Sequence, residues 1–237
     1  MNSHFHTSKA PVIDFFTGQI LGKDDDKRLI RLSSEYDGTC MLYSNDANPG
    51  RLFKLQLVGW GLQLDGTVVG LVPWLNNISL CPTLTDPLNG HWEGYFNAAN
   101  SDVFYAAPSH KVAELQAAYI YYCNNTHAYE LANKNRKEIV QEIPDHIGTH
   151  AVFNDAVQKA LHVRAIFSWQ LHADGNIEGM IVNPEKIQNT PVLIGDDALY
   201  SANTNPNFKY FFQYGIANKI KTKDATVIKA ISTLIEG

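Results

Sequence analysis

Apolar and polar positions follow the same order in two segments of the chain, and each segment begins at a tryptophan. Counted from Trp60 and from Trp169, both segments have Leu at position +2, Asp-Gly at +5 and +6, and Gly at +10. Val or Ile stands at +8 and +12 in both. The two tryptophans are 109 positions apart in a chain of 237 residues, a spacing that predicts a duplicated unit. The alternative is that two unrelated hairpins share a tryptophan by chance.

Asp-Gly pairs between β-rich runs predict hairpins, because both residues tolerate the positive φ that tight turns need. Three hairpins are expected, joining 28–36 to 39–44, 52–64 to 67–75, and 163–173 to 176–183. With a two-residue loop, Trp and the residue at +11 would share the core face, and the Gly at +10 would lie on the other face. A three-residue loop would shift these pairings by one. Since a glycine inside a strand often marks a close approach, we expect another element to pack tightly over both glycines.

The same order of elements follows each tryptophan hairpin. A proline-bearing coil comes first, then an aromatic strand at 91–96 or 208–214, then a segment with apolar residues at helical spacing. The last of these segments has its stripe at Val227, Ile231 and Leu234. Including two segments between the hairpins, we expect four helices, at about 110–123, 129–143, 153–161 and 224–235.

These elements predict an α+β fold: an antiparallel sheet based on β-hairpins, with helices packed on one face. The whole chain, 1–237, is expected to form a single compact domain. Its similar halves would be 52–123 and 163–235, separated by a helical insert at 124–162.

Charge and cysteine content indicate which classes of partner and which cell compartment to expect. A net charge of −5 and a pI near 6.0 argue against broad binding to nucleic acid or to an anionic membrane, which both need a dense basic surface. No apolar run approaches the roughly 18 residues of a membrane span. Cys40, Cys81 and Cys123 are odd in number and form no C-x-x-C pair, which is typical of reduced thiols. With no signal-peptide pattern at the N-terminus, these features predict a cytoplasmic protein.

The two copies of the repeat differ at +3 and +9, where His172 and Glu178 replace Gln63 and Val69. A duplicated scaffold can specialise in one half, and an imidazole can act as acid, base or ligand near neutral pH. His172 and Glu178 are therefore candidate ligand-binding residues. The alternative is that His172 is an ordinary surface residue beside a turn.

His91 and Glu93 form a second candidate pair. Residues two apart on a strand share a face, so this pair could serve as acid and base or as ligands. The alternative is an exposed polar face over a buried Trp92.

His146 and His150 are weak candidates for a metal site. On a helix they would lie one turn apart, a spacing that zinc sites use. Gly148 interrupts that turn, however, and no third ligand can be assigned. We therefore expect neither a metal nor a cofactor.

No nucleotide-binding loop and no hydrolase elbow occurs in the chain. We therefore expect a cytoplasmic non-catalytic module that binds a small molecule or a protein partner, in a groove between the two halves. The alternative is a hydrolase or transferase that uses His, Glu and Asp side chains, with or without a metal. A structural homodimer, formed through an exposed apolar patch at Trp74 and Leu75, is the third hypothesis.

Overall fold

The computed structural model describes residues 27–46, 49, 53–84, 90–97, 99–100, 102–125, 138–155, 160–183 and 198–213. Within these ranges the chain forms three antiparallel sheets, the helix α1 (Ser109–Asn125) and a short 3-10 turn, η1 (Cys81–Thr83).

The sheet that contains Trp60 is called the Trp60 sheet, and its strand order is β1 (Leu29–Ser34), β4 (Gly59–Gln63), β5 (Val68–Trp74) and β6 (Asn77–Leu80). The β2 sheet has the order β3 (Phe53–Gln56), β2 (Thr39–Asn45), β7 (Gly90–Asn97) and β8 (Asp102–Phe104). The six-stranded sheet has the order β13 (Leu199–Ser201), β12 (Ile177–Val182), β11 (Ala160–His172), β10 (Thr149–Asp155) and β14 (Phe208–Gln213), and β9 (Ile139–Pro144) also pairs with β11.

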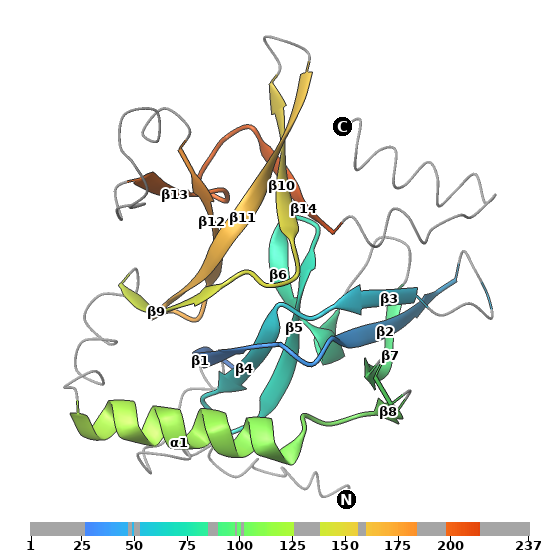
Figure 1. Cartoon of the computed structure of the whole chain (residues 1–237), viewed down its shortest axis with the longest axis vertical. Coiled ribbons are helices and arrows are strands. Elements are labelled where there is room, and N and C mark those ends of the chain that lie inside the picture. Colours follow the sequence, from blue (N-terminus) through green and yellow to red (C-terminus); the bar gives the residue numbers. More distant parts are fainter. Residues whose placement is uncertain are drawn as a thin grey trace, which may run out of the picture.

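The helix and the sheets follow one another along the molecule. Figure 1 shows α1 at one end, the Trp60 sheet next to it, and the six-stranded sheet beyond. The helix contacts β1 and β4, and β1 in turn contacts β9 and β11. The Trp60 sheet therefore has α1 on one side and the six-stranded sheet on the other.

The fold contains more sheet than the sequence predicts. The helix expected at 110–123 is confirmed by α1, which buries Leu115 and Tyr119. The helices expected at 129–143 and 153–161 are wrong wherever the chain is described, because β9, β10 and β11 form there. These segments pair with neighbouring strands, and such pairing outweighs a short helical spacing of apolar residues. The helix expected at 224–235 lies outside the described residues.

The first expected hairpin is a corner. Gly38 has the positive φ of a turn, at 70°, but β1 pairs with β4 while β2 pairs with β3 and β7. Asp37-Gly38 thus carries the chain from one sheet to another. The local turn was predicted correctly, and the pairing of its two strands was wrong.

The two tryptophan hairpins are confirmed as β4–β5 and β11–β12, with the three-residue loop. Trp60 pairs with Gly70 and Trp169 with Gly179, so the tryptophan and the glycine at +10 share a face. The face assignment for a two-residue loop is therefore wrong. Gly66 and Gly175 take φ of 86° and 88°, as the glycine of a three-residue loop with a bulge does.

The expected close packing over both glycines is confirmed. A Cβ on Gly70 would lie 2.5 Å from Cε1 of Tyr95, and one on Gly179 would lie 2.9 Å from Cε1 of Phe211. Tyr95 comes from β7, which pairs with β2, and Phe211 comes from β14, which pairs with β10. An aromatic ring thus covers each glycine. The glycine leaves room for that ring beside the tryptophan.

Two buried clusters fill the molecule. One contains Trp60, Tyr95, and Leu115 and Tyr119 of α1. The other joins two sheets, because Leu29 and Leu71 of the Trp60 sheet pack with Trp169 and Phe211 of the six-stranded sheet. This second cluster forms the seam between the two sheets.

Hydrogen bonds join the two sides of the seam along its length. The Gln141 side chain bonds to both the N–H and the carbonyl of Leu32 across the seam, and Gln213 makes the same two bonds to Gln56 of the neighbouring β2 sheet. The Phe211 N–H donates to the Leu75 carbonyl at 2.7 Å. Over these residues the seam is a packed interface.

Candidate functional site

Two chain corners, one leaving β1 and one leaving β9, are each held by a carboxylate. Glu35 accepts hydrogen bonds from the Trp60 indole and from the N–H groups of Asp37 and Thr39. Glu35 is only 4% exposed, and these three donors satisfy a carboxylate that has left water. The corner therefore has a fixed shape.

The second corner repeats this arrangement. Asp145 accepts from the Trp169 indole at 2.9 Å and from the Thr149 N–H at 2.8 Å. Gly148 has a φ of 69°, close to the 70° of Gly38 in the first corner. Each corner is thus tied to the tryptophan of its own hairpin.

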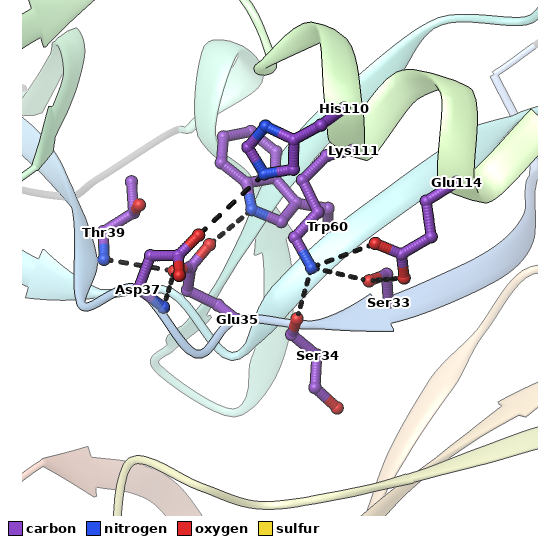
Figure 2. Close-up of polar contacts among 9 residues, drawn as sticks. All are labelled: Ser33, Ser34, Glu35, Asp37, Thr39, Trp60, His110, Lys111 and Glu114. Carbon is purple, nitrogen blue, oxygen red and sulfur yellow. Dashed lines mark hydrogen bonds and ion pairs between the residues drawn. The ribbon is translucent and has the colours of Figure 1, made fainter.

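A buried lysine joins α1 to the first corner. Figure 2 shows Lys111 pointing from the first turn of α1 toward the end of β1. Its Nζ donates to Ser33 Oγ and the Ser34 carbonyl at 3.1 Å each, and to Glu114 Oε2 at 3.2 Å. The Ser33 hydroxyl donates to Glu114 Oε1 at 2.6 Å. Three acceptors thus surround the three N–H bonds of one ammonium group.

The charge of Glu114 belongs to this network. Partial burial would raise the pKa of its carboxyl, but the hydrogen bonds from Ser33 and Lys111 and the charge of Lys111 outweigh burial and lower that pKa from the ordinary 4.5. Glu114 is therefore ionised at neutral pH and balances the buried ammonium.

The two corners meet at the surface beside α1. The rings of Tyr36 and His146 lie 4.5 Å apart, and Lys111 Nζ lies 6.0 Å from the Tyr36 ring centre. Asp37 and His110 approach within 3.9 Å, and both side chains are more than half exposed. We call this exposed region the corner surface; it comprises Tyr36, Asp37, His110, Glu114 and His146.

The predicted pair His172 and Glu178 is brought together. The Nε2 and Oε2 atoms lie 3.6 Å apart, with 14% and 29% of the two side chains exposed. Gln170, the cross-strand neighbour of Glu178, donates to Glu142 on β9 at 3.0 Å. These residues form a polar row across β9, β11 and β12. His172 and Glu178 thus face neighbouring side chains of the same sheet.

His91 and Glu93 are both exposed, and each interacts with a different residue near β2. His91 Nε2 lies 3.7 Å from Asp46, and Glu93 accepts from the Ser44 hydroxyl at 2.6 Å. A bulge at this point leaves Glu93 without a paired residue on β2. This pair lies on the β2 sheet, whereas His172 and Glu178 lie on the six-stranded sheet.

The helical placement of His146 and His150 is wrong. His146 lies in the corner between β9 and β10, and His150 is on β10 with Nδ1 2.9 Å from the Gly148 carbonyl. Gly148 has a positive φ, which fits the corner between β9 and β10 and is incompatible with a regular helix. Among the described residues, no group of three or more His, Cys, Asp or Glu side chains is placed to hold a metal ion.

The apolar patch suggested for a homodimer is not exposed. Trp74 and Leu75 are half-buried, and the Trp74 ring packs edge-on against Tyr43 at 5.3 Å. The Leu75 carbonyl takes part in the seam. Among the described residues, no helix is long and apolar enough to cross a membrane.

Sequence reasoning missed both corners, although a signal was present. Glu35-x-x-Gly38-Thr39 stands 25 residues before Trp60, and Asp145-x-x-Gly148-Thr149 stands 24 residues before Trp169. The pattern was overlooked because its first copy resembles the turn of a hairpin and its second copy resembles a helix. Lys111 and Ser33 gave no such signal, since only the packing of α1 brings them together.

Comparison with known proteins gives no function. No protein-family model matches the chain, and neither a curated protein nor a solved structure matches it.

Proposed function

We propose that this protein is a cytoplasmic, non-catalytic module that binds a protein partner through the corner surface. The observation that carries the proposal is the contact between Tyr36 and His146, two exposed rings on fixed corners. Tyr36 is 67% exposed although its neighbour Glu35 is buried. A rigid aromatic side chain gives a large contact area at low entropic cost, which is why tyrosine is enriched where proteins bind one another.

The charges around these rings favour a basic partner. Asp37, next to Tyr36 in the chain, has 58% of its side chain exposed, whereas the charge of Glu114 is balanced by Lys111. Lys111 is already surrounded by acceptors, so its positive charge contributes little to the surface. We therefore expect the partner to contribute an Arg or Lys side chain to the corner surface.

Matched hydrogen bonds support a duplication as the origin of the site. The Glu35 carboxylate bound to the Trp60 indole has its counterpart in Asp145 and Trp169. The pairing of β1 with β4 also matches that of β9 with β11. We infer two similar units, from β1 to β7 and from β9 to β14, which begin earlier than the halves at 52–123 and 163–235. The corner surface would then have formed where the equivalent corners of the two units meet.

Photo-crosslinking can test the binding proposal. A benzophenone amino acid at position 36 of the full chain should give a discrete adduct with a protein from the cytoplasm, and Asp37→Lys should abolish it. Tyr121, which is 71% exposed on α1, provides the matched control position. Adducts that form equally from positions 36 and 121, or that persist with Asp37→Lys, would rule out a specific site here.

A hydrolase is the second candidate because of Ser33. Its hydroxyl lies between the Glu114 carboxylate, which could accept the proton, and the Lys111 ammonium. It ranks second because Ser33 is only 6% exposed on a paired strand, and the lowered pKa of Glu114 makes that carboxylate a weak base.

A fluorophosphonate probe distinguishes the two candidates. The hydrolase requires a covalent adduct on Ser33 that Ser33→Ala abolishes and Ser34→Ala retains, because the Ser34 backbone carbonyl still accepts from Lys111. We expect no adduct on either residue in the native protein.

A further inference from the structure

The hairpin of β10 and β11 projects from the molecule. Figure 1 shows these two strands reaching past the other strands, at the top of the view. Three successive residues of β11, Leu161, His162 and Val163, are all exposed, at 38% for Leu161 and 47% for Val163. Because successive side chains of a strand point to opposite faces, both faces of β11 are open to water at this point.

Over the same stretch, one edge of β11 carries no strand in the described part of the chain. β12 pairs with β11 only as far as Ile166, just beyond a bulge. From Ala160 to Ala165, β11 pairs with β10 along its opposite edge. We call the edge of 161–165 that faces away from β10 the β11 edge.

The main-chain groups of the β11 edge point outward. The Asn154 N–H donates to the carbonyl of Asn207, which directly precedes β14, so the main-chain groups of Asn154 face β14. Its cross-strand partner Leu161 then points its own N–H and carbonyl away from β10. Since these groups alternate along a strand, Val163 and Ala165 point the same way as Leu161. These residues therefore offer their N–H and carbonyl groups to an added strand.

Two other edge strands are covered by side chains of the same chain. On β1 the Gln141 side chain bonds to the N–H and carbonyl of Leu32, and on β3 the Gln213 side chain bonds in the same way to Gln56. Natural sheets protect their edges because an open edge can pair with another chain. Among the described residues, no hydrogen bond of this kind reaches the β11 edge.

Charge indicates the kind of partner. Arg164 and His162 lie on one face of β11, and Leu161 and Val163 lie on the other. No carboxylate in the part of the chain that the structure describes forms an ion pair with Arg164. An added strand with an acidic residue opposite Arg164 and apolar residues on either side of it therefore matches both faces.

A second copy of the chain is a poor match for this edge. If two β11 edges paired antiparallel, the outward-pointing residues of one copy would stand opposite those of the other. The registers that join two or more such residues set Arg164 opposite Arg164 or His162, or His162 opposite itself. Since like groups directly opposite one another destabilise a strand pair, self-pairing is disfavoured.

We propose that the β11 edge binds an extended peptide segment of another protein, in which apolar residues alternate with acidic ones. The segment adds a strand to the six-stranded sheet where β12 leaves it. Hydrogen bonds to the main chain of 161–165 supply affinity, and a carboxylate beside Arg164 supplies specificity. The proposal does not rest on the corner surface, since no residue of that surface belongs to β11.

Binding of a labelled peptide tests the proposal. The probe is a short peptide in which valine alternates with glutamate, and the comparison is the same peptide with lysine in place of glutamate. In fluorescence anisotropy the full chain should bind the glutamate peptide at least about tenfold more tightly, because only this peptide can pair with Arg164. Arg164→Glu should reverse the order. Equal affinity for the two peptides, or no binding of the glutamate peptide, would overturn the proposal.

Two variants at one position test the main-chain contacts. Val163→Pro removes an N–H that points away from β10, so the pairing of β10 with β11 is kept. It should weaken binding of the glutamate peptide at least about tenfold, whereas Val163→Thr keeps the N–H and should change the affinity less than about threefold. Equal affinities of the two variants would contradict strand addition. Dimers of the native chain that Val163→Pro dissociates in sedimentation would overturn the proposal in favour of a second copy.

Hydrogen exchange of the native chain keeps the test independent of how the variants fold. The glutamate peptide should slow exchange at the N–H groups of Leu161, Val163 and Ala165. The N–H of Arg164, which faces β10, is the matched control and should exchange at an unchanged rate. Slower exchange at other strands without slowing at these three residues would place the peptide elsewhere and overturn the proposal.

Discussion

Trp60 and Trp169 occupy hairpins of the same design, yet different elements cover them. The Trp60 ring lies 4.9 Å from the ring of Tyr95, in a cluster that α1 closes with Leu115 and Tyr119. The Trp169 ring lies 5.0 Å from that of Phe211, in a cluster that the Trp60 sheet closes with Leu29 and Leu71. The repeated pattern therefore specifies which face is buried and leaves open which element buries it.

The two corners differ as well. Both hairpins use their tryptophan to hold a carboxylate, and α1 contacts β1, the strand that leads into the first corner. Lys111, Glu114 and His110 come from that helix. The first corner thus has added charged groups beside an arrangement that the second corner has in a simpler form.

Of the changes that test this comparison, removing the tryptophans should have the largest effect on stability. Trp60→Ala and Trp169→Ala should each lower the free energy of unfolding by about 3–5 kcal/mol, because both side chains are fully buried. Urea denaturation measures this loss. Hydrogen exchange should rise first in α1 for Trp60→Ala and first in β1 for Trp169→Ala. If the same element opens in both variants, the two clusters do not act separately.

The corner carboxylates should rank next. Glu35→Ala leaves three donors without their acceptor and should cost about 3 kcal/mol. Asp145→Ala leaves two donors, at a half-buried position, and should cost about 1–2 kcal/mol. Denaturation curves of both variants give the ranking. Glu35→Gln is the control, and its loss should fall between that of Glu35→Ala and the unchanged protein. Equal losses for Glu35→Ala and Asp145→Ala would remove the distinction between the corners.

The glycines that face the aromatic rings should show a graded effect. Gly70→Ala should cost about 2–3 kcal/mol and Gly179→Ala about 1–2 kcal/mol, because the added Cβ approaches a ring more closely at Gly70. Thermal and urea denaturation measure both. Tyr95→Leu combined with Gly70→Ala should be less destabilising than the sum of the two changes, because the clash is with that ring.

Gly148 provides the control for this series. A Cβ there would meet no atom within 4 Å, but its φ is 69°. Gly148→Ala should therefore cost only about 1 kcal/mol, from backbone strain. A greater loss here than at Gly70 would mean that strain, and not ring packing, determines the series.

The smallest expected effect is on pH dependence. The folded pKa of Glu114 is below its ordinary value of 4.5, so its contribution to stability is present above that pH and is lost as pH falls through the lower folded pKa. Glu114→Gln should remove this part of the acid destabilisation measured by urea denaturation from about pH 6 to about pH 3. The effect is small because half of the side chain is in water. Asp65→Asn, which removes a carboxylate paired with the exposed Lys27 in the β4–β5 loop, tests whether any paired carboxylate gives the same result.

Local features were predictable from the sequence because they depend on neighbours in the chain. The Asp-Gly loops, the tryptophan hairpins and the α1 stripe all follow from residues a few positions apart. The close packing over Gly70 and Gly179 was also predictable, since glycine within a strand is costly without such a contact.

The candidate site was much less predictable. Of the residues selected from the sequence, only His146 lies on the corner surface, and it was selected for a helical spacing that does not exist. Tyr36 and His146 meet although they stand 110 positions apart, and Lys111 reaches Ser33 across 78 positions. No periodicity records such contacts, because they depend on how complete elements pack.

The positions of the two tryptophan hairpins, the turn at 37–38 and the place of α1 follow from the sequence alone, because they depend on local φ preferences and on the spacing of apolar side chains. The corner at 37–38, the strands at 139–144 and 149–155, and the closing of the Trp169 core by the Trp60 sheet follow only from how the sheets pack. Hydrophobic burial has no direction of its own. Any apolar face of suitable shape can cover another, and the choice among them is made by the packing of the whole molecule.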